Sequence, residues 1–137
     1  MALSTEDQAL FAAAEAVRPK AHVPYSHFHV GAAILADDGK IYAGCNVENA
    51  AYPLGNCAEA SAIAAMIAGG GKRITRIFVT GPGAQPVTPC GGCRQRIREF
   101  AELSTPVICL GVDGGTPLET TLGALLPNSF GPEFLSA

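Results

Sequence analysis

Hydrophobic residues recur along the chain with two periods, and the change from one period to the other marks the predicted elements. The segment STEDQALFAAAEAVRP, residues 4–19, places apolar side chains at helical spacing: Ala9, Leu10, Ala13, Ala16 and Val17. Thr5 and Gln8 form a candidate capping box at its start, and Pro19 is a stop signal. The pattern predicts an N-terminal amphipathic helix.

Shorter apolar runs predict the strands. HVGAAILA (29–36) and KIYAGCNV (40–47) are joined by the turn sequence DDG, which predicts a hairpin. RITRIFVTG (73–81) and PVICLGV (106–112) predict a third and a fourth strand. The segment KAHVPYSHF (20–28) contains a proline and no sustained period, so we expect a loop there.

Two more helices are predicted between these strands. CAEASAIAAMIAGGG (57–71) is rich in alanine, its terminal glycines signal a helix end, and Asn56 stands where an N-cap residue is expected. This prediction puts Cys57 in the first helical turn. CRQRIREFAEL (93–103) has an amphipathic pattern and follows a loop rich in proline and glycine.

The order of these elements favours an α/β fold. After the opening hairpin, strands alternate with helices, which predicts helices packed against a mixed sheet and right-handed crossovers between parallel strands. The 137 residues, 48% of them hydrophobic, are enough for one core and too few for two ordinary domains. We therefore expect a single domain over residues 1–137.

Composition and charge narrow the classes of function. Twelve acidic and nine basic residues give a net charge of −3, which disfavours a nucleic acid polymer as partner. The chain has no apolar run long enough for a membrane span, and its acidic start lacks the pattern of a signal peptide. We expect no membrane association and a cytoplasmic location. Five cysteines, an odd number, then favour metal binding or catalysis over disulfides.

Three of these cysteines stand near predicted helix starts. PCGGC (89–93) is a Cys-x-x-Cys motif that, by itself, fits a zinc site, a redox pair or two buried thiols. Helix N-termini favour the thiolate form, which binds metal, so Cys57, Cys90 and Cys93 together could hold Zn²⁺. Three protein ligands leave one position open for water, as in catalytic zinc sites. Glu59 would stand beside that water, where a carboxylate can accept and return a proton.

Cys-x-Glu followed about thirty residues later by Pro-Cys-x-x-Cys is the three-cysteine version of the zinc nucleobase deaminase signature. Together with FHVGAAILADDGKIYAGCNVENAAYPLGNCAEASAI, PCGGCRQ and LLPNSF, it resembles the small homotetrameric cytidine deaminases over nearly the whole chain. The resemblance implies a three-layer α/β/α sandwich with a mixed sheet of about five strands. It also implies hydrolytic deamination of cytidine and deoxycytidine to uridine and deoxyuridine, with release of ammonia.

Matched residue by residue, the resemblance assigns roles to individual side chains. It makes Glu59 the proton shuttle and provides one Zn²⁺ per chain with the ligands Cys57, Cys90 and Cys93. Phe28 and the backbone of Ala58 match residues that contact the base, and Asn46 and Glu48 match residues that contact the ribose hydroxyls. Tyr52 and Phe130 match residues that complete a neighbouring subunit's pocket. The last pair implies a homotetramer with shared active sites.

Other interpretations of the same residues stay open at this point. A structural zinc module would need a fourth ligand, such as Cys45 or a histidine. A thioredoxin-like protein would use Cys90 and Cys93 for redox chemistry but would leave Cys57 and Glu59 unexplained. Cys45 and Cys109 lie in apolar strand contexts and are expected to be small buried hydrophobic side chains. We assign none of the three histidines, His22, His27 and His29, to zinc.

One position departs from the family pattern. Much of the family has an arginine directly after the shuttle glutamate, where it donates hydrogen bonds to the ligand thiolates, but this chain has Ala60. The compensating charge would then come from the two helix N-termini, with Arg94, the nearest cation in sequence to the ligand Cys93, as a further candidate. Because of this departure, deamination of a cytidine analogue, such as a nucleoside antibiotic or a modified cytosine nucleoside, is the alternative function.

Overall fold

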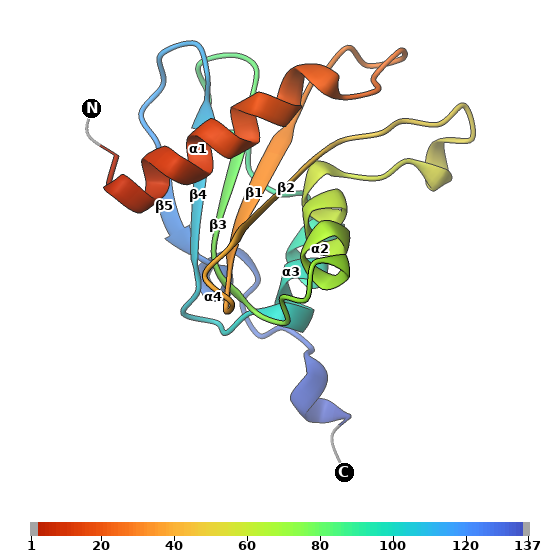
Figure 1. Ribbon diagram of the computed structural model, residues 1–137. Coiled ribbons are helices and arrows are strands. Elements are labelled where there is room, and N and C mark those ends of the chain that lie inside the picture. The colour runs from red at the N-terminus through yellow and green to blue at the C-terminus, as the bar shows by residue number, and fades with distance from the viewer. Residues whose placement is uncertain (1–2, 136–137) are drawn as a thin grey trace.

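The computed structural model describes residues 3–135 and contains four α-helices and five strands over that range (Figure 1). In chain order these are α1 (Thr5–Val17), β1 (Gly31–Ala36), β2 (Ile41–Cys45), α2 (Ala58–Ala68), β3 (Ile74–Gly81), α3 (Gly91–Phe100), β4 (Pro106–Gly111), β5 (Leu118–Thr121) and α4 (Leu122–Leu125). Short 3₁₀ turns occupy Arg18–Lys20, Tyr52–Leu54 and Pro132–Phe134.

The five strands form one mixed sheet in the order β2-β1-β3-β4-β5. β3 and β4 are parallel and are connected through α3, and every other neighbouring pair is antiparallel. The predicted hairpin is confirmed, because β1 pairs with β2 from Gly31 opposite Cys45 to Leu35 opposite Ile41. The mixed sheet of about five strands is therefore confirmed as well.

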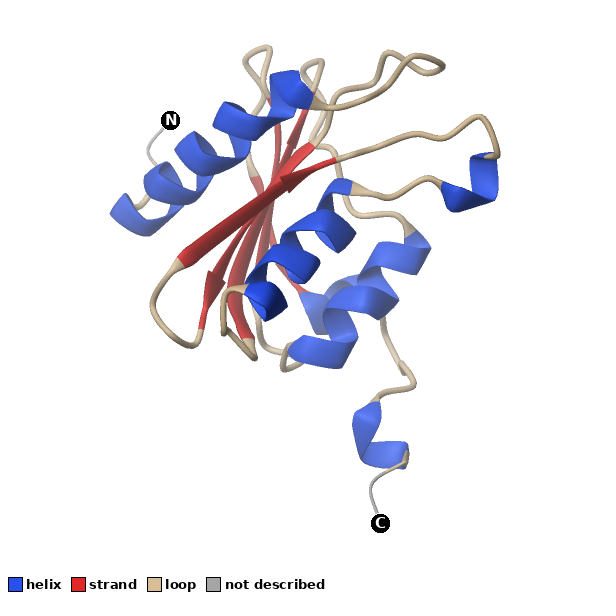
Figure 2. Cartoon of the chain, turned by 45° about the vertical axis from the view of Figure 1, so that its right-hand side comes forward, coloured by secondary structure: helices blue, strands red, loops and turns tan. Residues whose placement is uncertain are grey.

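Helices cover both faces of this sheet (Figure 2). α1 packs on one face, where Leu10 and Ala14 meet Phe78 and Ile108. α2 and α3 lie side by side on the other face, where Ala62, Met66 and Ile97 belong to a second cluster of buried apolar side chains. The three-layer α/β/α arrangement is thus confirmed, and α2 and α3 start next to each other at one end of the sheet.

Alternation along the strands explains why each face has its own core. In β3, Phe78 points toward α1, whereas Ile77 and Val79 belong to the cluster beneath α2 and α3. Successive side chains of a strand point to opposite faces, so one uninterrupted apolar run supplies both cores.

Two glycines let the helices approach the sheet closely. A Cβ added at Gly44 of β2 would lie 2.4 Å from the backbone nitrogen of Ala62 in α2. A Cβ added at Gly31 of β1 would lie 2.3 Å from the backbone oxygen of Ala14 in α1. Both contacts are shorter than a side chain tolerates, so these glycines determine how near α2 and α1 lie to the strands.

α1 is also held to the sheet by a buried ion pair. The Asp7 carboxylate is only 1% exposed and accepts a hydrogen bond of 2.6 Å from Nε of Arg76 in β3. The Arg76 guanidinium holds the pKa of Asp7 below its usual value, mainly through this hydrogen bond. The pair joins residues that lie far apart in the sequence and fixes the helix against the middle strand.

The helix starts differ from the predictions. Ser4, not Thr5, is the N-cap of α1, and its Oγ accepts a hydrogen bond of 3.1 Å from the backbone of Asp7. Cys57, not Asn56, is the N-cap of α2, because its extended backbone (φ −74°, ψ 157°) directly precedes the helix. α3 starts at Gly91, two residues before the predicted start, and places Cys90 at its N-cap.

No helix within residues 3–135 is long and apolar enough to cross a membrane.

Candidate functional site

Three cysteine sulfurs meet where α2 and α3 begin. Cys57 caps α2, Cys90 caps α3, and Cys93 lies in the first turn of α3. Their sulfur atoms lie within 4.8 Å of one another, close enough to bind one metal ion. Within residues 3–135, these three cysteines are the side chains that lie close enough together to share a metal ion, and neither Cys45 nor a histidine belongs to the group. Three sulfurs without a fourth protein ligand suit an open zinc site better than a structural one.

The environments of the three thiols differ. Backbone N–H groups at the start of α3, first that of Cys93, lower the pKa of Cys90 by stabilising its thiolate. Burial is the main cause that raises the pKa of Cys57 and of Cys93 above the usual thiol value. A helix N-terminus and a bound cation both favour thiolates, so the cluster suits a positive ion.

Glu59 lies in the first turn of α2 and is only 4% exposed. Burial raises the pKa of its carboxyl group, and the hydrogen bond with Cys93 and the charge of Arg96 oppose that rise. A carboxyl group with a raised pKa binds a proton more readily than an exposed one, which suits a group that accepts a proton and later returns it. Glu59 thus lies beside the cysteine cluster, in contact with Cys93.

A small pocket of about 160 Å³ opens beside the cluster. Its lining contains predicted ligands and predicted base contacts together with neighbouring residues: Phe28, Val30, Asn46, Cys57, Ala58, Glu59, Val87, Thr88 and Cys90. The structure thus brings together side chains from four separate parts of the chain. An aromatic ring, a carboxyl group and two thiols facing one hollow provide a surface for a flat, polar base.

The segment that carries Phe28 is fixed by polar contacts. Nδ2 of Asn46 donates a hydrogen bond of 2.8 Å to the backbone oxygen of Phe28, and Oδ1 of Asn46 accepts one of 2.9 Å from the backbone of Val30. The backbone N–H of Phe28 donates to Oγ of Ser26 at 3.0 Å. His27, just before the ring, has a left-handed backbone with φ 57°, a conformation in which His is enriched. Phe28, at 43% exposure, consequently faces the pocket instead of the core.

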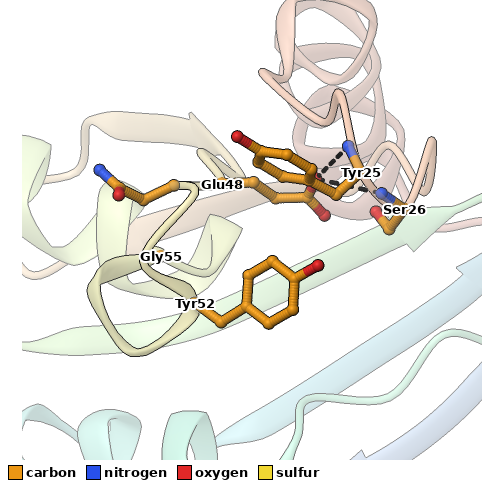
Figure 3. Close-up of a pocket in the computed structure, with 6 residues that line it drawn as sticks. Tyr25, Ser26, Glu48, Tyr52 and Gly55 are labelled. Carbon is orange, nitrogen blue, oxygen red and sulfur yellow. Dashed lines mark hydrogen bonds between the residues drawn. The ribbon is translucent and has the colours of Figure 1, made fainter.

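Glu48 and Tyr52 line a second, larger pocket of about 370 Å³ (Figure 3). Oε1 of Glu48 accepts hydrogen bonds from the backbone of Tyr25 at 3.0 Å and of Ser26 at 3.2 Å. A hydrogen bond with the Ser26 side chain is the main cause that lowers the pKa of Glu48, and the backbone contacts with Ser26 and Tyr25 add to it. Tyr52 is 74% exposed and meets the ring of Tyr25 edge-on, with the ring centres 5.8 Å apart.

Three stretches of backbone hold the two pockets next to each other. The backbone of Glu48 donates to His22 at 2.7 Å, and His22 in turn donates to Asn46 at 3.0 Å. Val47, between the two predicted ribose contacts, exchanges two backbone hydrogen bonds of 2.8 Å with Asn56. Since Asn56 directly precedes Cys57, this pairing ties the polar segment to the start of α2. Asn46 therefore lines the smaller pocket, and Glu48 lines the larger pocket next to it.

Phe130 lies outside both pockets of its own chain. It is 55% exposed and stacks on Phe134 at 5.0 Å between ring centres. Its backbone oxygen accepts a hydrogen bond of 2.9 Å from Nε2 of Gln95 in α3. Phe130 therefore lines neither of these two pockets.

The Arg94 guanidinium donates to backbone oxygens and not to a ligand sulfur, and Arg96 is the cation beside the cluster that sequence reasoning missed. The guanidinium of Arg94 donates to the backbone oxygens of Pro89 at 2.7 Å and Leu125 at 2.9 Å. Nη1 of Arg96 lies 3.6 Å from Sγ of Cys93 and donates to it. Helical spacing could have found this contact, because residues three apart share a helix face whereas adjacent residues do not.

The family pattern described as "Cytidine and deoxycytidylate deaminase zinc-binding region" matches residues 4–109. A cytidine deaminase from Sporosarcina psychrophila is 46% identical over 93% of this chain and 93% of its own length. A probable cytidine deaminase from Dictyostelium discoideum is 40% identical over 91% of this chain and 84% of its own.

The crystal structure of a cytidine deaminase from Burkholderia pseudomallei matches with a TM-score of 0.85 and 42% identity, over 93% of this chain and 100% of that one. Fold, sequence and the position of the cysteine cluster therefore agree. The chain belongs to the cytidine and deoxycytidylate deaminase family that this zinc-binding region defines.

Proposed function

We propose that this protein catalyses the hydrolytic deamination of cytidine and deoxycytidine to uridine and deoxyuridine, with release of ammonia. The observation that carries the proposal is the meeting of three cysteine sulfurs and a buried glutamate at one small pocket. Curated relatives that align with more than nine tenths of this chain are named cytidine deaminases. An analogue-specific enzyme, the alternative, has no comparable observation in its favour.

Cys57, Cys90 and Cys93 would hold the metal as thiolates. Zn²⁺ fits this donor set, because soft thiolate ligands select it and three of them leave one position for water. Zn²⁺ bound in such a site supplies a nucleophile from water at neutral pH. The role of the chain here is to keep the three sulfurs together at the ends of two packed helices.

Glu59 would move the protons of the reaction. Hydrolysis at C4 of the pyrimidine requires a proton at N3 and a second at the departing ammonia, and water is the source of both. The carboxyl group of Glu59 can carry each in turn, because it lies beside the cluster and burial raises its pKa, which favours the protonated form that donates. Its position two residues after Cys57 keeps it beside the cluster.

The rest of the pocket would orient the nucleoside. Phe28 offers an aromatic face to the base, and the backbone of Ala58 lies at the pocket's inner wall for the pyrimidine edge. Asn46 and Glu48 would contact the ribose hydroxyls from adjacent pockets. The contacts that Asn46 makes with the backbone of Phe28 and Val30 would hold it in place for that purpose.

A homotetramer with shared active sites is part of the proposal. Tyr52 and Phe130 leave 74% and 55% of their surfaces exposed, so both rings are accessible to a neighbouring subunit. Each would complete the pocket of a neighbouring subunit. A cytoplasmic location is also proposed, because the cluster requires reduced thiols.

The experiment is a substrate panel. The purified protein is given cytidine, deoxycytidine, cytosine, CMP, adenosine and several modified cytosine nucleosides, and ammonia release is measured for each. The proposal expects cytidine and deoxycytidine to have the highest kcat/KM. Turnover confined to a modified nucleoside, or no ammonia from any compound, would contradict it.

A further inference from the structure

Arg96 of α3 contacts the cysteine cluster from outside the pocket. Its Nη1 atom donates to Sγ of Cys93 at 3.6 Å, within the range for a hydrogen bond to sulfur. Cys93 is fully buried, whereas Arg96 is exposed. One ligand of the proposed metal site therefore has the Arg96 guanidinium as a cationic donor on its solvent side. The mechanism above does not use this contact.

The local sequence explains the direction of the Arg96 side chain. Residues 93 and 96 are three apart on one helix and share a face, and long helical side chains point back toward the N-terminus. The side chain passes close to Gly92, where an added Cβ would lie 3.4 Å from Nη1 of Arg96. α3 therefore brings the guanidinium back over its own first turn.

The contact between Arg96 and Cys93 matters because the metal site would carry a negative charge. Three thiolates around Zn²⁺ leave a net charge of −1, and the buried Glu59 carboxyl group stands next to them. Negative charge on a buried thiolate such as that of Cys93 is costly unless a cation or donor pairs with it. Arg96 supplies both at Cys93, and its charge also reaches Glu59.

Ala60 lies on α2, across a groove from Arg96 on α3. Ala60 and Arg96 line one open groove of about 440 Å³ between α2 and α3. The small side chain of Ala60 cannot donate to the sulfurs and leaves the groove free for the guanidinium. An arginine at residue 60 would start from the other wall of this groove, opposite Arg96.

We propose that Arg96 is a positioning residue for the metal site: it stabilises the Cys93 thiolate from α3 and supplies the charge that Ala60 cannot supply from α2. The inference rests on the proposed function, because it assumes that the three cysteines bind Zn²⁺. Groups that contact metal ligands typically change metal affinity by about 10–100-fold when they are removed.

The experiment compares Arg96→Met with wild type and with Arg73→Met. Methionine keeps an unbranched apolar stem and removes the charge and the donors. Arg73 is the matched control because its guanidinium pairs with the exposed Glu102 at 3.0 Å, away from the cluster. The dissociation constant for Zn²⁺ is measured by chelator competition, and the Co²⁺-loaded proteins are compared by their sulfur-to-cobalt charge-transfer band.

The proposal expects Arg96→Met to bind Zn²⁺ about 10–100-fold more weakly than wild type and Arg73→Met to bind it normally. The Co²⁺ band of Arg96→Met should move to longer wavelength, because a thiolate that accepts fewer hydrogen bonds gives up its electrons more easily. Adding Ala60→Arg to Arg96→Met should restore both measurements toward wild type. Circular dichroism checks that the variants are folded.

Equal Zn²⁺ affinity and equal Co²⁺ spectra for Arg96→Met and wild type would overturn the inference. So would weaker binding with an unchanged Co²⁺ band that Ala60→Arg does not restore, because the loss would then come from helix packing. A wild-type protein that binds no Zn²⁺ would instead refute the proposed function, so the two failures are distinguishable.

Discussion

Asn46 holds Phe28 in place: its Nδ2 atom donates a hydrogen bond of 2.8 Å to the backbone oxygen of Phe28. The Oδ1 atom of the same amide accepts from Val30, so one side chain joins the end of β2 to the segment before β1. The aromatic wall of the pocket therefore depends on an amide that is itself a proposed ribose contact.

Asn46→Asp tests this relationship. The carboxylate can still accept from the backbone of Val30, but it has no donor for the Phe28 oxygen and repels it. A hydrogen bond of this kind contributes about 0.5–1.5 kcal/mol, so the melting temperature should fall by a few degrees and kcat/KM by about tenfold or more. Zinc content should not change. Asn128→Asp, an equal charge change outside this pocket, is the control, and identical behaviour of the two variants would contradict the account.

The Asp7–Arg76 pair predicts a pH-dependent stability. The pKa of Asp7 is lowered in the folded protein, so its contribution is fully present above about pH 4, the ordinary range for Asp, and is lost as pH falls through the folded value. Asp7→Asn should therefore reduce the free energy of unfolding at pH 7 by about 1.5–3 kcal/mol, with a smaller difference at pH 3. Urea denaturation at both pH values measures it.

The exposed pair of Arg73 and Glu102 is the control for that experiment. The Glu102 side chain is 81% exposed, and ion pairs at the surface contribute about 0–1 kcal/mol. Glu102→Gln should change stability little at either pH. A loss for Asp7→Asn as small as that for Glu102→Gln would show that the buried pair does not anchor α1.

Much of the fold could be predicted from the chain because the two hydrophobic periods map directly onto helices and strands. β5 and α4 were not located individually, since LETT and LGAL are short and the strand is mostly exposed, so neither produces a periodic signal. The start of α2 was misplaced by one residue because Asn56 is a good capping residue. In the structure, its backbone pairs with Val47 and its side chain donates to Ser61 at 3.0 Å.

The cysteine cluster and Glu59 were predictable because their spacing within two short motifs already implies two helix starts. Arg96 was not found, because proximity in sequence favoured Arg94 while helix geometry turns that side chain toward Pro89 and Leu125. The separation of Asn46 and Glu48 into adjacent pockets also has no sequence signal, since it depends on backbone pairing with His22 and Asn56.

Metal analysis tests the ligand set. Wild type should contain one Zn²⁺ per chain, and Cys90→Ala should lose it because two thiolates and no replacement ligand remain. Cys45→Ala, in β2 and outside the cluster, should keep its zinc. Full zinc retention by Cys90→Ala, or loss in Cys45→Ala alone, would refute the proposed ligands.

Phe130→Ala tests the shared active site. The ring is 55% exposed and contributes little to its own subunit's core, so the chain should stay folded by circular dichroism. Light scattering should show a shift from tetramer toward smaller species, with loss of activity on dilution. A fully active wild-type monomer, or a Phe130→Ala variant with wild-type assembly and activity, would contradict the shared site.

The most direct test of the central claim is the kcat of Glu59→Gln for cytidine, measured together with its zinc content. Glutamine keeps the size of the side chain and cannot carry a proton, and proton transfer by a positioned group contributes about 10²–10⁴-fold to rate. The account predicts a folded, zinc-containing variant whose kcat falls by at least that factor, while Glu99→Gln on α3 stays active. A zinc-containing Glu59→Gln protein with near-normal kcat would contradict the claim that Glu59 moves the protons.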